Sequence, residues 1–451
     1  MLMLSLFTYM VYLAYNSYNS THLNRVAGMS TLFCMYLAWD SLSMQYSNMS
    51  LFNNWFSYDA GNSSMVTLLL TLVLTLIMYG TMTTRYTLNN PWMATLMLVN
   101  LMGLVLFPMV NDLMPLYVMM ELQSYSLYLL TGVYNKSYNA TRAAMTYFVT
   151  GGVASVLMLL SSAEVYQMSG LTNLTELTTY FHYNNNGSFN VLDMTLMGLV
   201  FKMGLAPLHA WSMAVYSYTP TYMTAYMSMV AKVSIMAFMY LHMALFNTQT
   251  LLTVFYLSMA MAAYTPLYQV TLKSMLAYSG MLNFGYTTTS VMLGDEMFYM
   301  YMMQYSLTHM LMFYAMLAMS EYTATPSSQW SPMVNVNQLM VPNKTLALLF
   351  IMALFSLIGM PPLPGFYGKY YVMTALMHNG LYMEGMAIMM FSVMATYYYA
   401  YMIKQLATNL TLSFKPLNGT LSLMLSIYGM LIMSFFMALP YTLQGYSMMA
   451  L

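Results

Sequence analysis

Stretches of about 20 mostly apolar residues alternate with short polar or Pro- and Gly-containing segments along the whole chain. A helix of that length spans the hydrocarbon layer of a bilayer, whereas the strands of a membrane barrel need strict alternation, which these stretches lack. The pattern therefore predicts an all-α polytopic membrane protein surrounded by lipid. We expect about 14 transmembrane helices, at residues 1–15, 26–43, 64–84, 92–110, 113–133, 143–165, 191–211, 221–245, 250–270, 274–293, 297–320, 345–378, 385–403 and 420–440.

The composition supports the same conclusion. Charged residues make up 5% of the chain, against roughly 25% in a soluble domain, and 60% of the residues are hydrophobic, which excludes a soluble protein. The net charge is zero, so no basic field exists to attract nucleic acid. The single cysteine, Cys34, excludes a disulfide framework, an iron–sulfur cluster or a thiolate zinc site within this chain alone.

The basic residues of the connections predict the orientation, because Lys and Arg in short loops concentrate on the side that was not translocated. With this count of spans, all basic residues outside the spans fall in odd-numbered connections: Arg25, Arg85, Lys136, Arg142, Lys273, Lys344, Lys404 and Lys415. We therefore expect both termini on the opposite face. A thirteen-span topology stays open if residues 1–15 lie on the membrane surface.

Methionine is unusually frequent relative to isoleucine, with 61 Met against 8 Ile. Filling of irregular gaps in a core does not explain this ratio, whereas a genome that reads the isoleucine codon AUA as Met does. The ratio indicates organellar coding. Drift within an apolar composition is the alternative.

Four charged residues remain deep in the predicted spans: Glu121, Lys202, Lys232 and Lys369. A charge at the centre of a membrane helix costs about 2.5–3.5 kcal/mol on insertion scales, so such groups mark ion paths and proton relays by default. Burial penalises the ammonium form, so a buried lysine can gain and lose a proton. We predict a proton relay. The alternative is that each lysine pairs with a carboxylate or with carbonyls and only fixes helix packing.

Helix breakers stand beside two of these lysines. Because proline removes a backbone donor and disfavours helix at the preceding residue, we expect discontinuous helices around Lys202–Pro207 and around Pro361–Gly368. Broken spans at corresponding positions of two halves indicate inverted repeats around an ion path. The predicted parts are an N-terminal three-helix segment, a first and a second five-helix repeat and a C-terminal helix, at residues 1–90, 91–245, 250–403 and 404–451.

Two histidines, His209 and His309, are possible further stations of the relay. His209 follows Lys202 by seven residues and shares its helix face if the helix continues through the break, and His309 lies in the middle of a span. A lone histidine in a membrane helix is more often a satisfied hydrogen-bonding group. The sequence has no phosphate loop, dinucleotide fingerprint or nucleophile motif, so a relay must take its energy from a gradient or a partner.

The segments that carry these charges resemble the antiporter-like membrane subunits of respiratory complex I, of the N type. The matching stretches are MELQSYSLYLLTGV (120–133), FKMGLAPLHAWSMAVYSYTPTYMTAYMSMVAK (201–232), LKSMLAYSGMLNFGY (272–286) and SLIGMPPLPGFYGKYY (356–371). The resemblance is specific in order and spacing between residues 120 and 371, and weak before residue 90 and after residue 380.

This resemblance implies roles, partners and a location. It places the family's fifth-helix Glu at Glu121 and its relay lysines at Lys202, Lys232 and Lys369. NADH, FMN, iron–sulfur clusters and ubiquinone would be bound by other subunits, and this chain would hold no cofactor or metal. Its partners would be other membrane-arm subunits, including antiporter-like neighbours. The expected location is the mitochondrial inner membrane, with odd-numbered loops in the matrix and both termini in the intermembrane space.

Three positions depart from the family pattern. Ala231 replaces the usual Pro before Lys232, Ala214 and Ser217 replace an Asp and a Glu, and Asn283 replaces a His. The first departure puts the local geometry of Lys232 in doubt. Two other functions stay open: a stand-alone secondary cation/proton antiporter of related fold, and a structural spacer whose charges only hold helices together.

Overall fold

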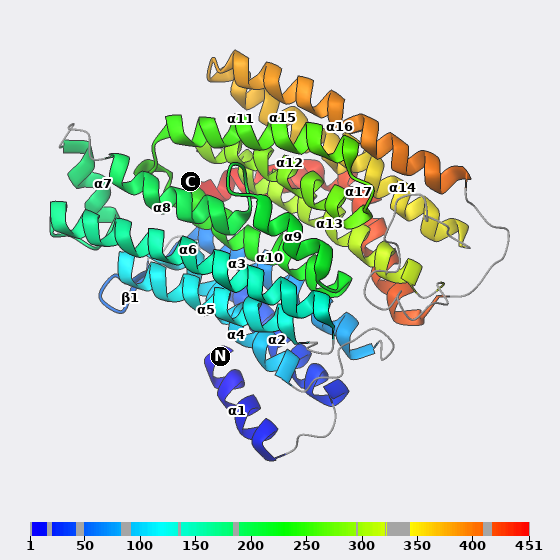
Figure 1. The fold of residues 1–451 in the computed structure, drawn as a ribbon, viewed down its shortest axis with the longest axis horizontal. Coiled ribbons are helices and arrows are strands. Elements are labelled where there is room, and N and C mark those ends of the chain that lie inside the picture. The colour runs from blue at the N-terminus through cyan, green and yellow to red at the C-terminus, as the bar shows by residue number, and fades with distance from the viewer. Residues whose placement is uncertain are drawn as a thin grey trace. The chain divides into compact units, whose positions relative to one another are not determined.

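The computed structural model describes residues 2–15, 20–41, 49–82, 92–133, 137–183, 189–294, 296–320, 322, 343–408 and 417–450. These residues form seventeen α-helices and one two-stranded sheet (Figure 1). The chain divides into two compact units, the first of residues 1–204, 208–211 and 230–253 and the second of residues 205–207, 212–229 and 254–451. Of the predicted loop cations, Arg85, Lys136 and Lys415 lie outside the described residues.

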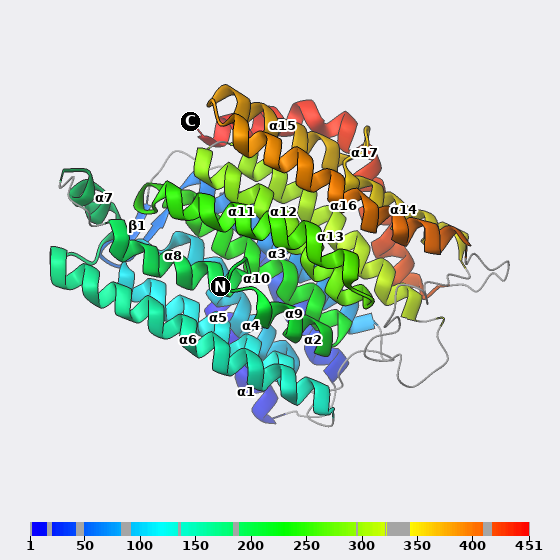
Figure 2. The same ribbon diagram turned by 45° about the horizontal axis from the view of Figure 1, so that its top comes forward.

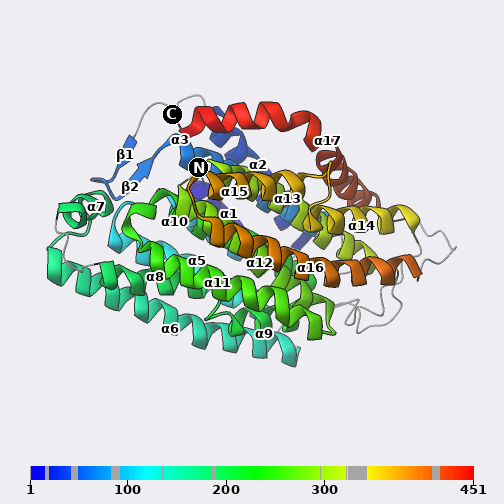
Figure 3. The same ribbon diagram turned by 90° about the horizontal axis from the view of Figure 1, so that it is seen from above.

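The first unit is a helical bundle with one hairpin. Its elements are α1 (Leu2–Tyr15), α2 (Ser20–Ser41), β1 (Met49–Leu51), β2 (Phe56–Tyr58), α3 (Ala60–Met82), α4 (Trp92–Leu106), α5 (Leu113–Gly132), α6 (Tyr138–Ser169), α7 (Leu174–Tyr183) and α8 (Phe189–Met203). α2 packs against α3, and α5 packs against both α4 and α6. α6 also lies beside α8 (Figure 3).

A carboxylate fixes the start of α5, the helix that carries Glu121. Asp112 caps α5 by accepting a hydrogen bond from the Met114 backbone N–H at 3.0 Å. The Thr172 hydroxyl, in the connection that follows α6, donates to the other Asp112 oxygen at 2.9 Å. The beginning of α5 is thereby held to the segment before α7.

The second unit consists of helices. Its elements are most of α11 (Thr248–Tyr264), then α12 (Leu272–Leu293), α13 (Met297–Ser320), α14 (Lys344–Ile358), α15 (Pro364–His378), α16 (Tyr382–Thr408) and α17 (Gly419–Ala450), while α9 (Ala210–Tyr218) and α10 (Thr221–Leu241) contribute residues to both units. α13 packs against α14, α15 and α17. α16 packs against α14 and α15 (Figure 2).

Both predicted helix breaks are present. α8 ends at Met203 and α9 begins at Ala210, and α14 ends at Ile358 and α15 begins at Pro364. Gly204 and Gly359 have φ angles of 67° and 93°, the left-handed conformation that commonly ends a helix. Each lysine beside a break therefore lies within one or two turns of a helix end, where backbone carbonyls or N–H groups lack helical partners.

The helices confirm the prediction of an all-α polytopic membrane protein. Within the described ranges, seven helices are long and apolar enough to cross a membrane, and each predicted apolar stretch contains an α-helix. The count of fourteen spans stays a prediction, because several of the helices are shorter than a bilayer requires.

The approach of α15 to α14 allows only glycine at residue 365. A Cβ atom at Gly365 would overlap the backbone oxygen of Ser356. We expect Gly365→Ala to push the two helices apart and to lower the free energy of unfolding by roughly 1–3 kcal/mol through overpacking. The matched control is Gly419→Ala, where a Cβ would meet no atom within 4 Å.

The measurement is the fraction of chain that stays soluble in mild detergent after heating. Gly365→Ala should lower the temperature at which half is lost, and Gly419→Ala should leave it unchanged. Equal heating curves for the two variants would show that the contact between α14 and α15 tolerates an added methyl group, contrary to the structure.

Candidate functional site

Lys202 lies in the last turn of α8, directly before the first break. Its side chain is 6% exposed. Its Nζ donates hydrogen bonds to the Ser124 hydroxyl at 2.8 Å and to the Tyr128 hydroxyl at 3.1 Å, both on α5. The same nitrogen lies 5.6 Å from the centroid of the Tyr128 ring, a cation–π distance. Hydroxyls can both accept and donate, so Lys202 is joined to groups that can pass a proton on.

Glu121 stands on α5, three residues before Ser124 and therefore on the same helix face. Its side chain is 8% exposed and it interacts electrostatically with Lys202. Its Oε1 accepts no hydrogen bond from any described residue. The face of α5 thus presents a carboxylate and two hydroxyls in succession, and the two hydroxyls are the groups that bind Lys202 of α8.

The aromatic residues around the break hold Tyr128 in place. The Tyr128 ring meets the Tyr147 ring edge to face, with centroids 4.7 Å apart. Tyr147 stacks on Trp211 at 4.7 Å, and the Trp211 indole N–H donates to the backbone oxygen of Phe201 at 2.8 Å. The backbone next to Lys202 and the hydroxyl that accepts from it are therefore fixed by the same stack of rings.

Lys369 lies in α15, after the second break. Its Nζ donates to the backbone oxygens of Leu357 and Ile358, at 2.7 Å and 3.0 Å, which are the last two carbonyls of α14. These carbonyls have no helical partner, and the end of a helix favours a cation. The nitrogen also lies 5.4 Å from the centroid of the Tyr286 ring. Lys369 therefore closes the second break, which gives it a structural role in addition to any role in transport.

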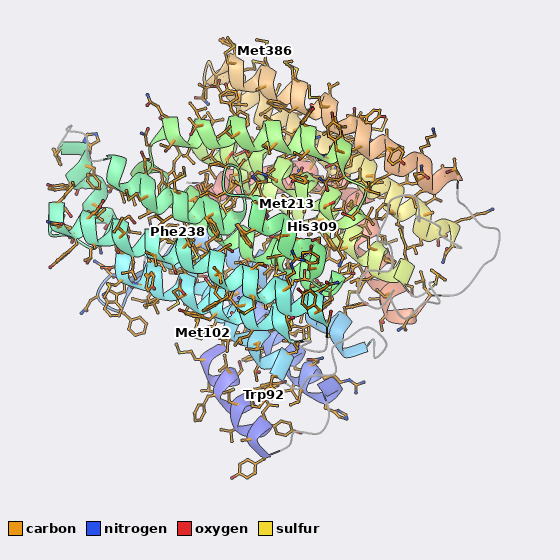
Figure 4. The ribbon with its side chains drawn as sticks, viewed as in Figure 1. Trp92, Met102, Met213, Phe238, His309 and Met386 are labelled. Carbon is orange, nitrogen blue, oxygen red and sulfur yellow. The ribbon has the colours of Figure 1, made fainter. Side chains whose placement is uncertain are left out.

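The other predicted residues lie on different elements. Lys232 is buried in α10, with 3% of its side chain exposed. His309 is buried on α13 (Figure 4), and its Nε2 lies 3.0 Å from the Ser228 hydroxyl of α10. His209 is in the connection between α8 and α9. The helix does not continue from Lys202 to His209, because α8 ends at Met203 and α9 begins at Ala210, so the two residues do not share a helix face.

The structure thus brings Glu121 and Lys202 together through α5. It also joins His309 to α10 and Lys369 to the end of α14. Among the described residues, no cluster of three or more His, Cys, Asp or Glu side chains could hold a metal ion. What the arrangement can do is move protons between hydroxyls, amines and carboxylates.

Sequence reasoning missed two buried charges. Lys273, expected in a connection, lies in the first turn of α12, and its Nζ donates to the Thr219 backbone oxygen at 2.6 Å. Glu384, also expected in a connection, is buried in the first turn of α16 and accepts a hydrogen bond from the Tyr256 hydroxyl at 3.2 Å. Polar residues lie a few positions before each of them, so nothing in the local sequence indicates that the two side chains are buried.

Residues 110–397 match the family model described as NADH:quinone oxidoreductase/Mrp antiporter, TM. The chain belongs to this family. Over 454 aligned residues it is 60% identical to NADH-ubiquinone oxidoreductase chain 2 of Candida albicans, covering 100% of this chain and 96% of that protein. It is 46% identical to the protein of the same name from Debaryomyces hansenii, covering 92% of each.

A chain of one solved structure has the same fold. A chain in respiratory complex I from Thermus thermophilus with bound aureothin superposes with a TM-score of 0.80 at 21% identity, and the match covers 97% of both chains. At this identity the likeness shows the fold alone.

Two adjacent glycines of α6 test the contact between Tyr128 and Lys202. A Cβ atom at Gly151 would overlap the Tyr128 hydroxyl, whereas a Cβ at Gly152 would meet no atom within 4 Å. Gly151→Ala should push the Tyr128 ring away and remove one acceptor of Lys202. Because a hydrogen bond to a charged group contributes about 1.5–3 kcal/mol, NADH-driven proton translocation should fall roughly tenfold or more. Gly152→Ala is the control and should translocate protons normally. Normal translocation by Gly151→Ala would contradict the role of Tyr128.

Proposed function

We propose that this chain is a proton-translocating membrane-arm subunit of NADH:ubiquinone oxidoreductase, and that it relays protons through Glu121, Lys202, Lys232 and Lys369. The observation that carries the proposal is the buried Lys202 ammonium, held by two hydroxyls on the helix that bears the buried Glu121. The full-length similarity to chain 2 of this enzyme supports it. His309 is the favoured further station, because it lies within hydrogen-bonding distance of Ser228 on the helix of Lys232, and His209 is kept as a possible one.

The charge on Glu121 controls the proton on Lys202. While Glu121 is ionised, it stabilises the Lys202 ammonium electrostatically. When Glu121 takes up a proton or moves away, that stabilisation is lost and the buried ammonium becomes costly. The Lys202 proton then passes to Ser124 or Tyr128, whose own hydroxyl proton moves on.

The rest of the architecture follows from the two breaks. We propose that residues 91–245 and 250–403 are inverted five-helix repeats, each with one broken helix carrying a lysine, within a total of about 14 spans. Residues 1–90 add three helices, and residues 404–451 add one. Of the cations that the sequence places in odd-numbered connections, the structure has four within α2, α6, α14 and α16, near the helix ends: Arg25, Arg142, Lys344 and Lys404. We place those helix ends and the odd-numbered loops on the matrix side and both termini in the intermembrane space.

The proposed location is the mitochondrial inner membrane, supported by the ratio of Met to Ile and by the similarity to fungal chain 2 proteins. The partners are other membrane-arm subunits, including antiporter-like neighbours. NADH, FMN, iron–sulfur clusters and ubiquinone are bound by those other subunits. Quinone reduction elsewhere in the enzyme then supplies the energy that this chain uses.

A second candidate is a stand-alone cation/proton antiporter of related fold. The family description includes the Mrp antiporter, so the fold fits both. Full-length identity of 60% to a chain 2 protein favours the redox-driven enzyme. Mild detergent extraction and mass spectrometry separate the two, because the chain should comigrate with NADH:quinone reductase activity only in the first case.

The substitution Lys202→Met tests the relay. It removes the charge and keeps a long apolar side chain, so the enzyme should assemble and oxidise NADH with an artificial acceptor normally. Protons translocated per NADH and quinone-coupled turnover should both fall, by roughly tenfold for the latter, because one hydrogen-bonded charge is lost from the path. Lys344→Met, which removes an exposed lysine at the start of α14, is the control. An unchanged proton yield in an assembled Lys202→Met enzyme would refute the relay role.

A further inference from the structure

A buried polar network crosses three helices of the second unit. The Tyr301 hydroxyl of α13 donates to Asn283 Oδ1 of α12 at 2.8 Å. The Asn283 amide donates to the Ser279 backbone oxygen at 2.8 Å. The Ser279 hydroxyl is in turn hydrogen-bonded to the Tyr399 hydroxyl of α16. All four side chains are at least nine-tenths buried, so the network is shielded from the surroundings of the bundle.

Tyr286 places this network beside Lys369. Its ring centroid lies 5.4 Å from the Lys369 nitrogen and 5.7 Å from the centroid of the Tyr301 ring. From Tyr301 the network leads through Asn283 and Ser279 to Tyr399. Tyr286 therefore stands between the lysine of the second break and the hydroxyls that lead to α16.

Tyr286 is 1% exposed, and its hydroxyl makes no hydrogen bond to any described residue. A buried hydroxyl without a protein partner costs free energy, and such groups are usually satisfied by ordered water or have a functional role. Phenylalanine would fill the same space and keep the ring over Lys369. Packing alone therefore does not account for a tyrosine at this position.

The Lys369 ammonium has one N–H donor that could bind the same water as the Tyr286 hydroxyl. An ammonium carries three N–H donors, and the described residues accept two of them, through the carbonyls of Leu357 and Ile358. The third donor has no oxygen or nitrogen acceptor among the described residues and faces the side of Tyr286, whose ring is at cation–π distance. One internal water molecule between Lys369 and the Tyr286 hydroxyl would satisfy both.

We propose that the hydroxyls of Tyr286, Tyr399 and Ser279 form a proton branch that connects Lys369 with α16 through internal water. Lys369 gives a proton to the water and becomes a neutral amine, and the water releases one of its own protons to Tyr286. A second internal water carries the proton from Tyr286, which has no direct hydrogen bond to a described residue, to the hydrogen-bonded hydroxyls of Ser279 and Tyr399. An N–H bond breaks at Lys369, and at every oxygen one O–H bond forms and one breaks, so no electron is transferred. The positive charge moves with the proton and leaves from Tyr399 to water at α16. Asn283 and Tyr301 act as positioning residues, because an amide fixes the orientation of its neighbours without passing the proton on.

This inference rests on the proposed function of Lys369, and Tyr286→Phe in the assembled enzyme tests it. The variant removes only the hydroxyl. We expect NADH oxidation with an artificial acceptor to be normal, and proton translocation coupled to quinone reduction to fall roughly tenfold, as for loss of one hydrogen bond to a charged group. The solvent isotope effect of D₂O on translocation should rise, because the damaged step becomes limiting. A purely structural role would not change the isotope effect.

The matched control is Tyr314→Phe, which removes a buried hydroxyl on α13 whose ring packs against Tyr428. It should translocate protons at the normal rate with the normal isotope effect. Tyr399→Phe is the second test variant and should resemble Tyr286→Phe, which keeps the proposal testable if one variant fails to assemble. Normal translocation by both Tyr286→Phe and Tyr399→Phe would overturn the branch.

Lys369→Met separates this inference from the function on which it rests. If Lys369→Met loses translocation while Tyr286→Phe and Tyr399→Phe keep it, the relay stands and the branch is wrong. If Lys369→Met itself translocates normally, the role of Lys369 in the relay is refuted.

Discussion

An ammonium group inside a membrane protein must place its hydrogen-bond donors on protein groups or on enclosed water, because the lipid offers none. This constraint governs both breaks in the chain. A continuous helix satisfies its own carbonyls, so a lysine buried in it must find its acceptors on other elements. At the ends of α8 and α14, the lysine beside each break binds either backbone carbonyls that have no helical partner or hydroxyls of a neighbouring helix.

The two breaks meet this constraint differently. Lys202 is held by the hydroxyls of Ser124 and Tyr128, which can both accept and donate a proton, and the helix that carries these hydroxyls also carries the buried Glu121 carboxylate. Lys369 is held by two backbone carbonyls, which only accept. The first arrangement is suited to a proton donor whose affinity changes during turnover. The second is suited to a fixed cation that needs a separate outlet for its proton.

The sequence predicted the helical class, both breaks and the burial of Glu121, Lys202 and Lys232, because hydropathy, proline chemistry and isolated charges are local signals. It could not predict the acceptors of Lys202, since the approach of α5 to α8 depends on packing between segments far apart in the chain. Lys273 was placed in a connection, because a lysine at a helix start is ordinarily exposed. In the structure its Nζ binds the Thr219 backbone oxygen just after α9, a contact between distant segments that no local sequence pattern indicates. The fourteen-span count and the inverted repeats stay predictions.

The coupling between Glu121 and Lys202 is tested most directly by a double-mutant cycle on the rate of NADH-driven proton translocation in assembled enzyme. The rate is measured for Glu121→Gln, for Lys202→Met and for the two together. If the carboxylate acts by controlling the lysine, the double variant should be no slower than the worse single variant, since each change disables the same step. Losses that multiply, so that the double variant is slower by the product of the two single effects, would show that the residues act independently and would contradict the account.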